Sequence, residues 1–205
     1  MIGQWKENEN ETLYRKENIM AKAGSTFLDI DNSFPKLELQ LLSGEILNLP
    51  EGFGEGYGIV LFYRGYWWPY CRQQLADFQA ALTGYHAEQI KVIAGSVDPV
   101  EKTRELSNKL GITYPIAHGL DAETISRLTG GFYEKEKKYL QPTGIMVRPD
   151  KNVEMAVYST GAVGRFVAQD VLSAVKYYKS QLKWWVFRIW AYDCSVNPLK
   201  YRYLR

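Results

Sequence analysis

Runs of hydrophobic residues with two different periods alternate along the chain. The segment 34–50 has leucine at alternate positions and a Ser43–Gly44 turn, which predicts two short strands joined as a hairpin. The runs Gly58–Tyr63 and Ile90–Ala94 are apolar without polar alternation, as is typical of strands covered on both faces. These two runs therefore predict the centre of a sheet.

A helical pattern follows the first of these two strands. Hydrophobic residues recur there at steps of four and three positions, at Cys71, Leu75, Phe78, Leu82 and Tyr85. This spacing is that of one face of an α-helix, so a single helix is predicted over these residues.

A second helix is predicted after the strand at Ile90–Ala94. Asp98 is a favoured N-cap residue, Pro99 suits the first helical position, and Gly111 suits the end of the helix. A brief helix over Ala122–Leu128 comes next in the chain.

The C-terminal part of the pattern contains a hairpin and a last helix. The runs Ile145–Arg148 and Val153–Tyr158 flank the turn Pro149–Asn152, and the final helix is predicted from near Gly164. Strands that alternate with helices and then form an antiparallel edge indicate an α/β fold, with a mixed central sheet and helices on both faces.

Composition removes several classes of function. The 25 Lys and Arg against 23 Asp and Glu leave a charge of +2, so no strong field attracts a nucleic acid. Two cysteines and two histidines argue against a disulfide scaffold and a protein-built metal site. No secretory signal or membrane span is visible, so we expect a cytoplasmic protein in which Cys71 and Cys194 are thiols.

Three segments differ in composition. Residues 1–24 are a polar N-terminal extension, residues 25–182 hold the predicted domain, and residues 183–205 form a tail rich in Trp, Tyr and Arg. A hydrophobic stripe with helical spacing runs from the last helix into the tail. Three interpretations of it stay open: packing on its own domain, a homodimer interface through the C-terminal helix, or contact with a membrane surface.

The segment Leu61–Leu75 carries the clearest chemical signal. A buried strand turns through Arg64–Gly65 directly into a helix, with Pro69 near its first turn and Cys71 just after it. Free N–H groups and the positive end of the helix dipole favour a thiolate at such a position. Cys71 is therefore a candidate nucleophile.

The stretch Phe62–Leu75 (FYRGYWWPYCRQQL) resembles the signature of the peroxiredoxin-like, thiol-specific-antioxidant (AhpC/TSA) branch of the thioredoxin superfamily. That branch usually carries an Arg-Gly-x-Trp-Cys-Pro-x-Cys core. Gln141-Pro142-Thr143 resembles the loop that places a cis-proline beside the active thiol, and Gly164-Arg165 also fits the branch. The resemblance covers about residues 36–181 and implies a thioredoxin-like three-layer α/β/α sandwich.

Trp68 departs from this family pattern, which has the first Cys of a Cys-x-x-Cys pair at its position. A dithiol oxidoreductase needs two sulfurs within reach, so Trp68 rules out dithiol chemistry inside the motif. The peroxidatic pattern of the superfamily has Thr at the position of Trp68 and Pro at that of Arg64. An indole N–H donates a hydrogen bond but accepts none, so it does not replace the threonine hydroxyl.

Three interpretations of Cys71 stay open. In the first, it is a peroxidatic thiolate that becomes a sulfenic acid, which an external thiol or Cys194 then resolves. In the second, it is a structural residue, because free cysteines are among the most buried residues. In the third, the region is a binding surface in which Tyr66, Trp68 and Pro142 form an aromatic groove.

The resemblance implies a thiol-based oxidoreductase that reduces hydroperoxides or disulfides through Cys71 alone. Arg64 or Arg165 would stabilise the thiolate. The family places cations near the thiol, so Arg148 and Arg165 could face it, and the alternative for each is a salt-bridged surface group. The candidate substrate-binding residues are Tyr66, Trp68, Pro69, Gln141, Pro142 and Thr143. No metal or organic cofactor is expected, and a thiol reductant such as thioredoxin or glutathione is the implied partner. The alternative function is a redox-silent binding module that acts through its Trp-rich surface.

Overall fold

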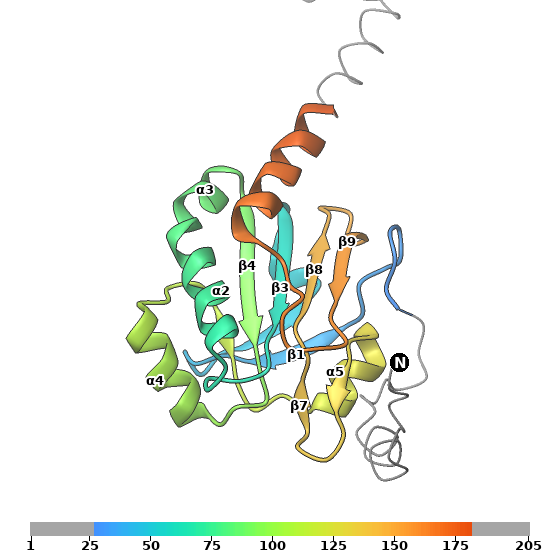
Figure 1. The fold of residues 1–205 in the computed structure, drawn as a ribbon. Helices are drawn as coiled ribbons and strands as arrows, with labels where there is room; N and C mark the ends of the chain where they lie inside the picture. The colour runs from blue at the N-terminus through green and yellow to red at the C-terminus, as the bar shows by residue number, and fades with distance from the viewer. Residues whose placement is uncertain (1–26, 182–205) are drawn as a thin grey trace, which may run out of the picture. The chain divides into compact units, whose positions relative to one another are not determined.

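The computed structural model describes residues 27–181, and Figure 1 shows their arrangement. The chain forms two compact units, residues 1–168 and 169–205. The first unit contains the sheet and the candidate site, and the described part of the second is helical. The predicted N-terminal extension, the C-terminal tail and Cys194 lie outside the described residues, so the expectations about them stay predictions.

A five-stranded sheet forms the centre of the first unit (Figure 1). The middle strand β3 (Tyr57–Phe62) pairs in parallel with β4 (Ile90–Gly95), which pairs in parallel with β5 (Ile116–Ala117). On its other side β3 pairs antiparallel with β8 (Thr143–Val147), and β8 pairs antiparallel with β9 (Val153–Tyr158). The order β5-β4-β3-β8-β9 confirms the predicted mixed sheet.

Two small hairpins accompany the sheet. β1 (Leu37–Gln40) and β2 (Ile46–Leu49) pair antiparallel, as the alternating leucines predict. β6 (Tyr133–Glu134) and β7 (Tyr139–Leu140) form a second hairpin, whose turn is the charged run 135–138. Strands of two residues are too short to show a period, so the sequence pattern does not reveal this second hairpin.

Helices connect the strands of the first unit. They are η1 (Glu51–Phe53, a 3-10 turn), α2 (Pro69–Ala80), α3 (Leu82–Ala87), α4 (Val100–Leu110) and α5 (Ala122–Thr129). The prediction of one helix through Tyr85 is wrong, because the helix breaks at Ala81, whose backbone has φ −87° and ψ 0°. The N–H of Gly84 bonds to the Ala81 carbonyl at 2.9 Å, three residues back, and this tighter turn starts α3.

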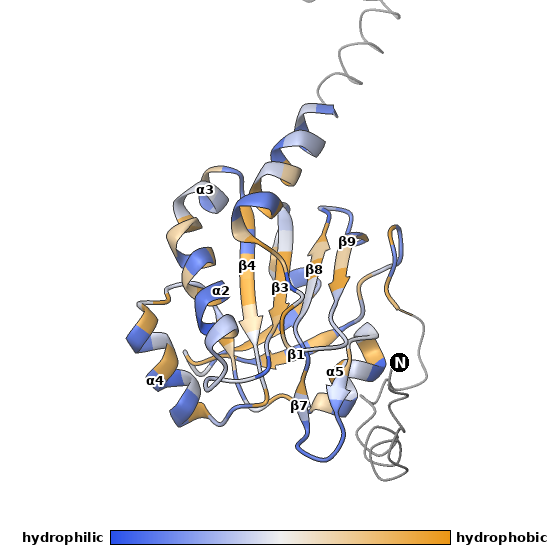
Figure 2. Ribbon diagram, in the orientation of Figure 1, coloured by the Kyte–Doolittle hydropathy of each residue, from blue (hydrophilic) through white to orange (hydrophobic). Residues whose placement is uncertain are grey.

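Alternate side chains of β3 pack into different layers. Val60 and Phe62 belong to a hydrophobic cluster that also takes residues from β1, β2 and α5. Ile59, Leu61 and Tyr63 point to the opposite face, because successive side chains of a strand alternate, and α2, α3 and α4 cover that face. Figure 2 shows the strands as hydrophobic between more polar helices. The fold is the predicted thioredoxin-like three-layer α/β/α sandwich.

The segment that follows β9 is not helical until residue 168. The predicted last helix is therefore present, but it begins at residue 168 and not near Gly164. The carbonyl oxygens of Ala162 and Phe166 accept hydrogen bonds from the side chains of Trp68 and Gln74. These bonds hold the backbone in an irregular path, and a helix would direct the same carbonyls to its own N–H groups.

Candidate active site

A glycine turn separates β3 from α2. A Cβ added at Gly65 would lie 2.6 Å from Nε1 of Trp67 and 3.1 Å from Oδ1 of Asp98. A larger residue would push the Trp67 ring away and crowd the carboxylate, so the turn needs glycine. The chain can thus pass closely between these two side chains on its way from the strand to the helix.

The first turn of α2 places Cys71 where the sequence predicts it. Trp68 is the N-cap residue and Pro69 occupies the first helical position. The backbone of Trp68 is extended, with φ −89° and ψ 116°, as expected of a residue that precedes proline. Cys71 therefore lies close to the positive end of the helix dipole, which favours a negatively charged sulfur.

The cation that contacts Cys71 is Arg165. Its Nη1 lies 3.6 Å from the Sγ atom of Cys71. Its Nε donates to the Val163 carbonyl at 2.7 Å, and its Nη2 donates to the Ala162 carbonyl. A guanidinium at this distance can donate a hydrogen bond to the sulfur and can pair with it when it is negatively charged.

The Cys71 side chain is fully buried. Burial alone would suit the interpretation as a structural cysteine, and Leu75 and Phe78 of the same helix face are equally buried. A neutral thiol also accepts a weak hydrogen bond from a guanidinium, so the contact with Arg165 fits both interpretations. The contact with Arg165 supplies the positive charge found beside reactive cysteines, whereas the full burial of Cys71 is a feature of structural cysteines.

Residues 159–168, which we call the strap, are tied to α2 and α3 by side-chain hydrogen bonds. Trp68 Nε1 donates to the Ala162 carbonyl at 2.9 Å, and Gln74 Nε2 donates to the Phe166 carbonyl at 3.0 Å. The hydroxyl of Tyr85 donates to the Ala168 carbonyl at 2.7 Å. The strap therefore follows the two helices, and it carries Arg165 to Cys71.

Arg64 lies in an aromatic box formed by Trp67, Trp68 and Tyr139. Its Cζ is 5.3, 4.6 and 4.7 Å from the centres of these three rings. Its Nη2 donates to the Tyr139 hydroxyl at 2.6 Å. Among the described residues, the structure brings Arg165 to the sulfur and directs Arg64 to the aromatic rings.

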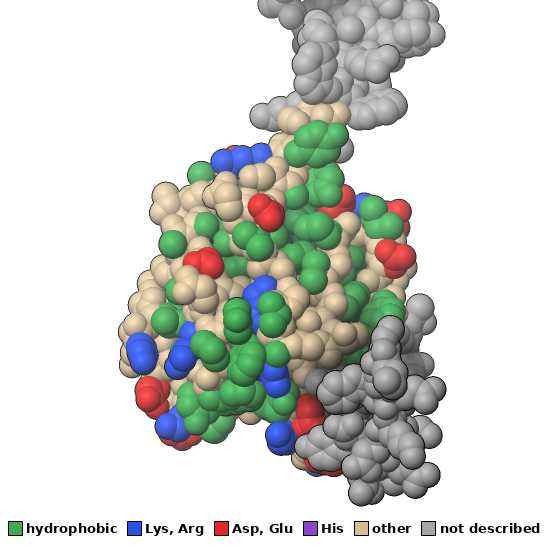
Figure 3. Space-filling view, in the orientation of Figure 1, with side chains coloured by type: hydrophobic (Ala, Val, Ile, Leu, Met, Phe, Trp, Pro, Cys, Tyr) green, Lys and Arg blue, Asp and Glu red, His purple; other side chains and the backbone are tan. Residues whose placement is uncertain are grey.

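The aromatic box reaches the surface. Trp67 and Tyr70 are 42% and 52% exposed, and Val163 of the strap is exposed as well. Figure 3 shows hydrophobic side chains gathered over the loop between β3 and α2, with basic groups between them. The Tyr66 ring contacts a different cation, since its centre lies 5.3 Å from Nζ of Lys102.

The Gln141-Pro142-Thr143 loop enters β8 at the same edge of the sheet. Thr143 pairs with Phe62, the last residue of β3, and the Pro142 carbonyl accepts a hydrogen bond from Ser159 N–H at 3.1 Å. The predicted cis-proline is wrong: within residues 27–181 the cis peptide bond is Leu49–Pro50, and Gln141–Pro142 is trans. The Pro142 carbonyl thus fixes the start of the strap.

Asp98 is not the cap of α4 that the sequence predicts. Pro99 is the N-cap residue, and no side chain caps this helix. Oδ2 of Asp98 instead accepts hydrogen bonds from Ser96 Oγ at 2.8 Å and from Tyr66 N–H at 2.7 Å. Burial raises the pKa of this carboxyl group above its usual value. Asp98 therefore holds the loop that leads to α2.

Arg148 is not part of the site around Cys71. Its guanidinium pairs with Asp31 at 2.7 Å, Asp150 at 3.3 Å and Glu154 at 3.3 Å. Of the two alternatives for Arg148, the structure therefore shows the salt-bridged surface group and not a cation facing Cys71.

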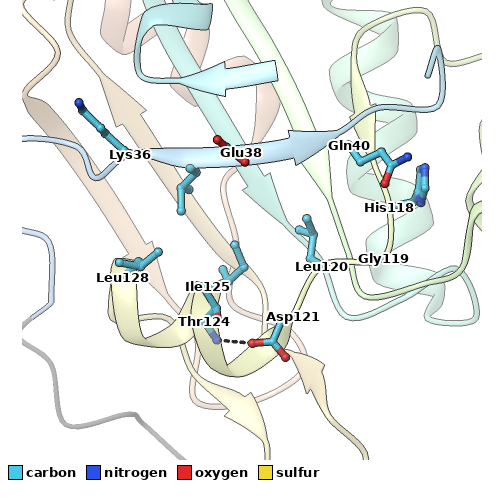
Figure 4. Close-up of a pocket in the computed structure, with 11 residues that line it drawn as sticks. Lys36, Glu38, Gln40, His118, Gly119, Leu120, Asp121, Thr124, Ile125 and Leu128 are labelled. Atoms are coloured by element: carbon cyan, nitrogen blue, oxygen red, sulfur yellow. Dashed lines mark hydrogen bonds between the residues drawn. The ribbon is translucent and has the colours of Figure 1, made fainter. Parts of the chain in front are cut away.

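The remaining features do not add a cofactor site. Within residues 27–181, no cluster of His, Cys, Asp and Glu could hold a metal ion, and no helix is long and apolar enough to cross a membrane. A separate cavity of about 420 Å³ lies between β1 and α5 (Figure 4). Its lining includes Lys36, Glu38, His118 and Asp121, and it includes no residue of the site around Cys71.

Sequence patterns alone do not reveal three parts of this site. The Ala162 carbonyl is a backbone group and carries no residue-specific signal. Tyr139 belongs to a hairpin too short to show a period, and Asp98 fits a helix cap equally well. Among the predicted residues, the structure joins Cys71 to Arg165 and Trp68 to Arg64.

Comparison with solved structures gives the same architecture. The chain is 16% identical to peroxidoxin BcpB of Mycobacterium tuberculosis, with a TM-score of 0.64 over 73% of this chain and 97% of that chain. It is 17% identical to AhpC of Mycobacterium bovis, with a TM-score of 0.65 over 77% and 96%. For the bacterioferritin comigratory protein of Xanthomonas campestris the identity is 20% and the TM-score 0.58, over 75% and 99%. At these identities the likeness shows the fold.

The family model of the AhpC/TSA family matches residues 30–156, which is more than half of the chain and includes Cys71. No curated protein matches the chain. The matched residues run from before β1 into β9, whose last two residues lie beyond the match. The chain therefore belongs to the AhpC/TSA family of thiol-based peroxidases, within the thioredoxin superfamily.

Proposed function

We propose that this protein reduces hydroperoxides through Cys71 as its single active-site thiol. The observation that carries the proposal is the contact between the Arg165 guanidinium and Cys71 Sγ, 3.6 Å apart, in the first turn of α2. A helix N-terminus and a cation together favour the thiolate, which is the nucleophilic form of cysteine. Trp68 removes the second sulfur of a dithiol motif, so the sulfur chemistry in this motif rests on Cys71.

The reaction is a two-electron oxidation of sulfur. The Cys71 thiolate attacks the terminal oxygen of the hydroperoxide, a sulfur–oxygen bond forms, and the oxygen–oxygen bond breaks. The leaving oxygen departs as an alkoxide, or as hydroxide when the substrate is hydrogen peroxide, and takes up a proton. The sulfur becomes a sulfenic acid. Arg165 stabilises the thiolate before the attack and binds the developing charge on the leaving oxygen.

An external thiol completes the cycle. One thiol molecule displaces the sulfenic oxygen as water and forms a mixed disulfide with Cys71, and a second releases the Cys71 thiolate and leaves as a disulfide. Glutathione or thioredoxin, in a reducing cytoplasm, would supply these electrons. Cys194 is the candidate for an internal resolving thiol, either within the chain or across a homodimer formed through the C-terminal helix.

The fully buried sulfur sets a requirement for this reaction. A peroxide reaches Sγ only when the side chains around it open, since the Cys71 side chain is fully buried. The strap and the aromatic box are the neighbouring segments that reach the surface, with Val163 and Trp67 exposed. Local opening of such segments requires much less free energy than global unfolding.

The test is peroxide consumption by the parent protein and by Cys71→Ser, with glutathione or thioredoxin as reductant. We expect the serine variant to lose at least about a hundredfold in rate, because serine cannot form the sulfenic acid. Mass spectrometry after one equivalent of peroxide should find a single added oxygen on Cys71. Cys194→Ser serves as the matched control and shows whether Cys194 resolves Cys71. Equal rates for parent and Cys71→Ser would exclude the proposed peroxidase and favour the redox-silent binding module.

A further inference from the structure

Two donors converge on the Ala162 carbonyl. Trp68 Nε1 donates to it at 2.9 Å, and Nη2 of Arg165 donates to the same oxygen. A carbonyl oxygen has two lone pairs and can accept both bonds at once. The side chain that departs from the family pattern is therefore joined, through one backbone oxygen, to the cation that contacts Cys71.

Contacts with Arg64 and Trp67 hold the Trp68 indole in place. Arg64 lies 4.6 Å from the centre of its ring, and Arg64 is fixed by its 2.6 Å hydrogen bond to the Tyr139 hydroxyl. The Trp67 ring packs against the indole edge to face, with centres 5.6 Å apart. These contacts orient the indole N–H toward the strap.

The part of the strap that carries Arg165 has few other attachments. Ser159 is held at one end by the Pro142 carbonyl, and Gln74 holds Phe166 at the other end. Between these points, in the described part of the chain, the side-chain hydrogen bonds that reach the strap from outside are those of Trp68 to Ala162 and of Arg165 to Cys71. Arg165 also lies over the Tyr70 ring, with its Cζ 5.7 Å from the ring centre. Trp68 is thus the hydrogen-bonding tether that reaches the backbone of the stretch between the two anchors.

We propose that Trp68 is a positioning residue, whose indole N–H holds the strap so that Arg165 stays against Cys71. This inference rests on the proposed role of Cys71 as the reactive thiol. The hydroxyl of a threonine, which the peroxidatic pattern has at this position, is attached directly to Cβ. The indole nitrogen is carried on the far side of a ring, so tryptophan extends to a carbonyl of another segment. Trp68 does a different task from the residue that it replaces.

The test follows the alkylation rate of Cys71 by iodoacetamide as a function of pH, in the full chain with Cys194→Ser, so that a single thiol reacts. In Trp68→Phe we expect the midpoint of the pH profile to rise by about half a pH unit, because Arg165 loses its fixed position beside the sulfur. The midpoint is the readout, since a change in access alone scales the rate at every pH. Trp67→Phe keeps an aromatic ring against the Trp68 indole and removes only the exposed Trp67 N–H, so it should leave the midpoint unchanged.

A double variant separates positioning from a general loosening of the site. Arg165→Met should raise the midpoint more than Trp68→Phe does, and Trp68→Phe should add nothing further in the Arg165→Met background. An undiminished effect of Trp68→Phe in that background would overturn the proposal, because Trp68 would then act independently of Arg165. A Trp68→Phe midpoint equal to that of the parent would overturn it as well.

Hydrogen exchange of the indole N–H groups tests the tether without altering Trp68. In the parent chain, the Trp68 indole N–H should exchange at least tenfold more slowly than that of Trp67, and equal exchange would contradict the tether. None of these measurements needs peroxide. A shifted alkylation profile without peroxide consumption would leave the positioning role and remove the proposed peroxidase. Peroxide consumption with unshifted alkylation profiles would support the proposed peroxidase and overturn the positioning role of Trp68.

Discussion

Two strand-to-helix turns lie side by side at the same edge of the sheet. Both contain a proline at the start of the helix, but the side chains that they position have different roles. β3 leads into α2 and β4 leads into α4, and these two strands pair in parallel. Trp68–Pro69 starts α2 and Pro99 starts α4, and neither helix has a side chain that caps its N-terminus. The first turn presents a sulfur to a guanidinium, whereas the second buries a carboxylate.

The difference between the two turns shows how one of them supports the other. Asp98 of the second turn accepts the N–H of Tyr66 in the first, at 2.7 Å. The buried Asp98 carboxylate thus holds the backbone of the first turn in place. The sulfur of Cys71 contacts Arg165 instead. Parallel pairing makes this division of tasks possible, because it brings the ends of consecutive strands to one edge.

The largest effect should come from the cation at the first turn. Replacing Arg165 by Met removes the charge beside Cys71, and we expect the rate of peroxide reduction to fall by roughly ten- to a hundredfold. Arg64→Met is the matched control, since Arg64 contacts aromatic rings. Arg64→Met should reduce stability, measured by chemical denaturation, and should lower the rate less than Arg165→Met does, because Arg64 acts on Arg165 only through Trp68. Similar losses of rate in the two variants would contradict the assignment of Arg165.

Changes to Asp98 in the second turn should reduce the stability of the protein and alter how that stability depends on pH. Asp98→Ala removes the acceptor of the fully buried Ser96 side chain and of Tyr66 N–H, so we expect a loss of about 2 kcal/mol in the free energy of unfolding. Urea denaturation measures this loss. A cost below about 0.5 kcal/mol would show that Asp98 does not support the first turn.

The pH dependence has a defined sign. The pKa of Asp98 in the folded chain is raised above the usual 3.8 by burial, so the folded state binds this proton more tightly than the unfolded state. The contribution of Asp98 is most favourable below pH 3.8 and decreases as the pH rises through the folded-state value. Asp98→Asn keeps an acceptor without the titration, so its stability relative to the parent should increase with pH across this window. A constant difference would contradict the raised pKa.

The smallest effect on stability should come from the start of a third helix, α5. This helix has a side-chain cap at its N-terminus, which α2 and α4 lack. Asp121 precedes α5 and accepts the Thr124 N–H at 2.8 Å. Hydrogen bonding from the Thr124 side chain, together with this backbone bond, lowers the pKa of Asp121. Asp121→Ala should reduce the free energy of unfolding by about 1 kcal/mol, as measured by urea denaturation, and Asp121→Asn should retain most of it. Peroxide reduction should be unchanged in both variants, since Asp121 lies outside the site around Cys71.

The sequence by itself determined the central sheet and the position of the sulfur. Apolar runs without alternation mark β3 and β4, since a strand covered on both faces has no polar side, and proline with an apolar stripe marks the start of α2. These signals are local, so they can be read from neighbouring positions. The family signature around Cys71 is local for the same reason.

Only the tertiary structure decided which cation meets the sulfur and what Trp68 and Asp98 do. Arg64 is seven positions from Cys71 and contacts aromatic rings, whereas Arg165 is distant in the chain and contacts Sγ. The strap brings Arg165 there through hydrogen bonds to backbone carbonyls, which every residue type possesses. Long-range pairing of this kind leaves no periodic trace, because it depends on where distant segments meet after the sheet has formed.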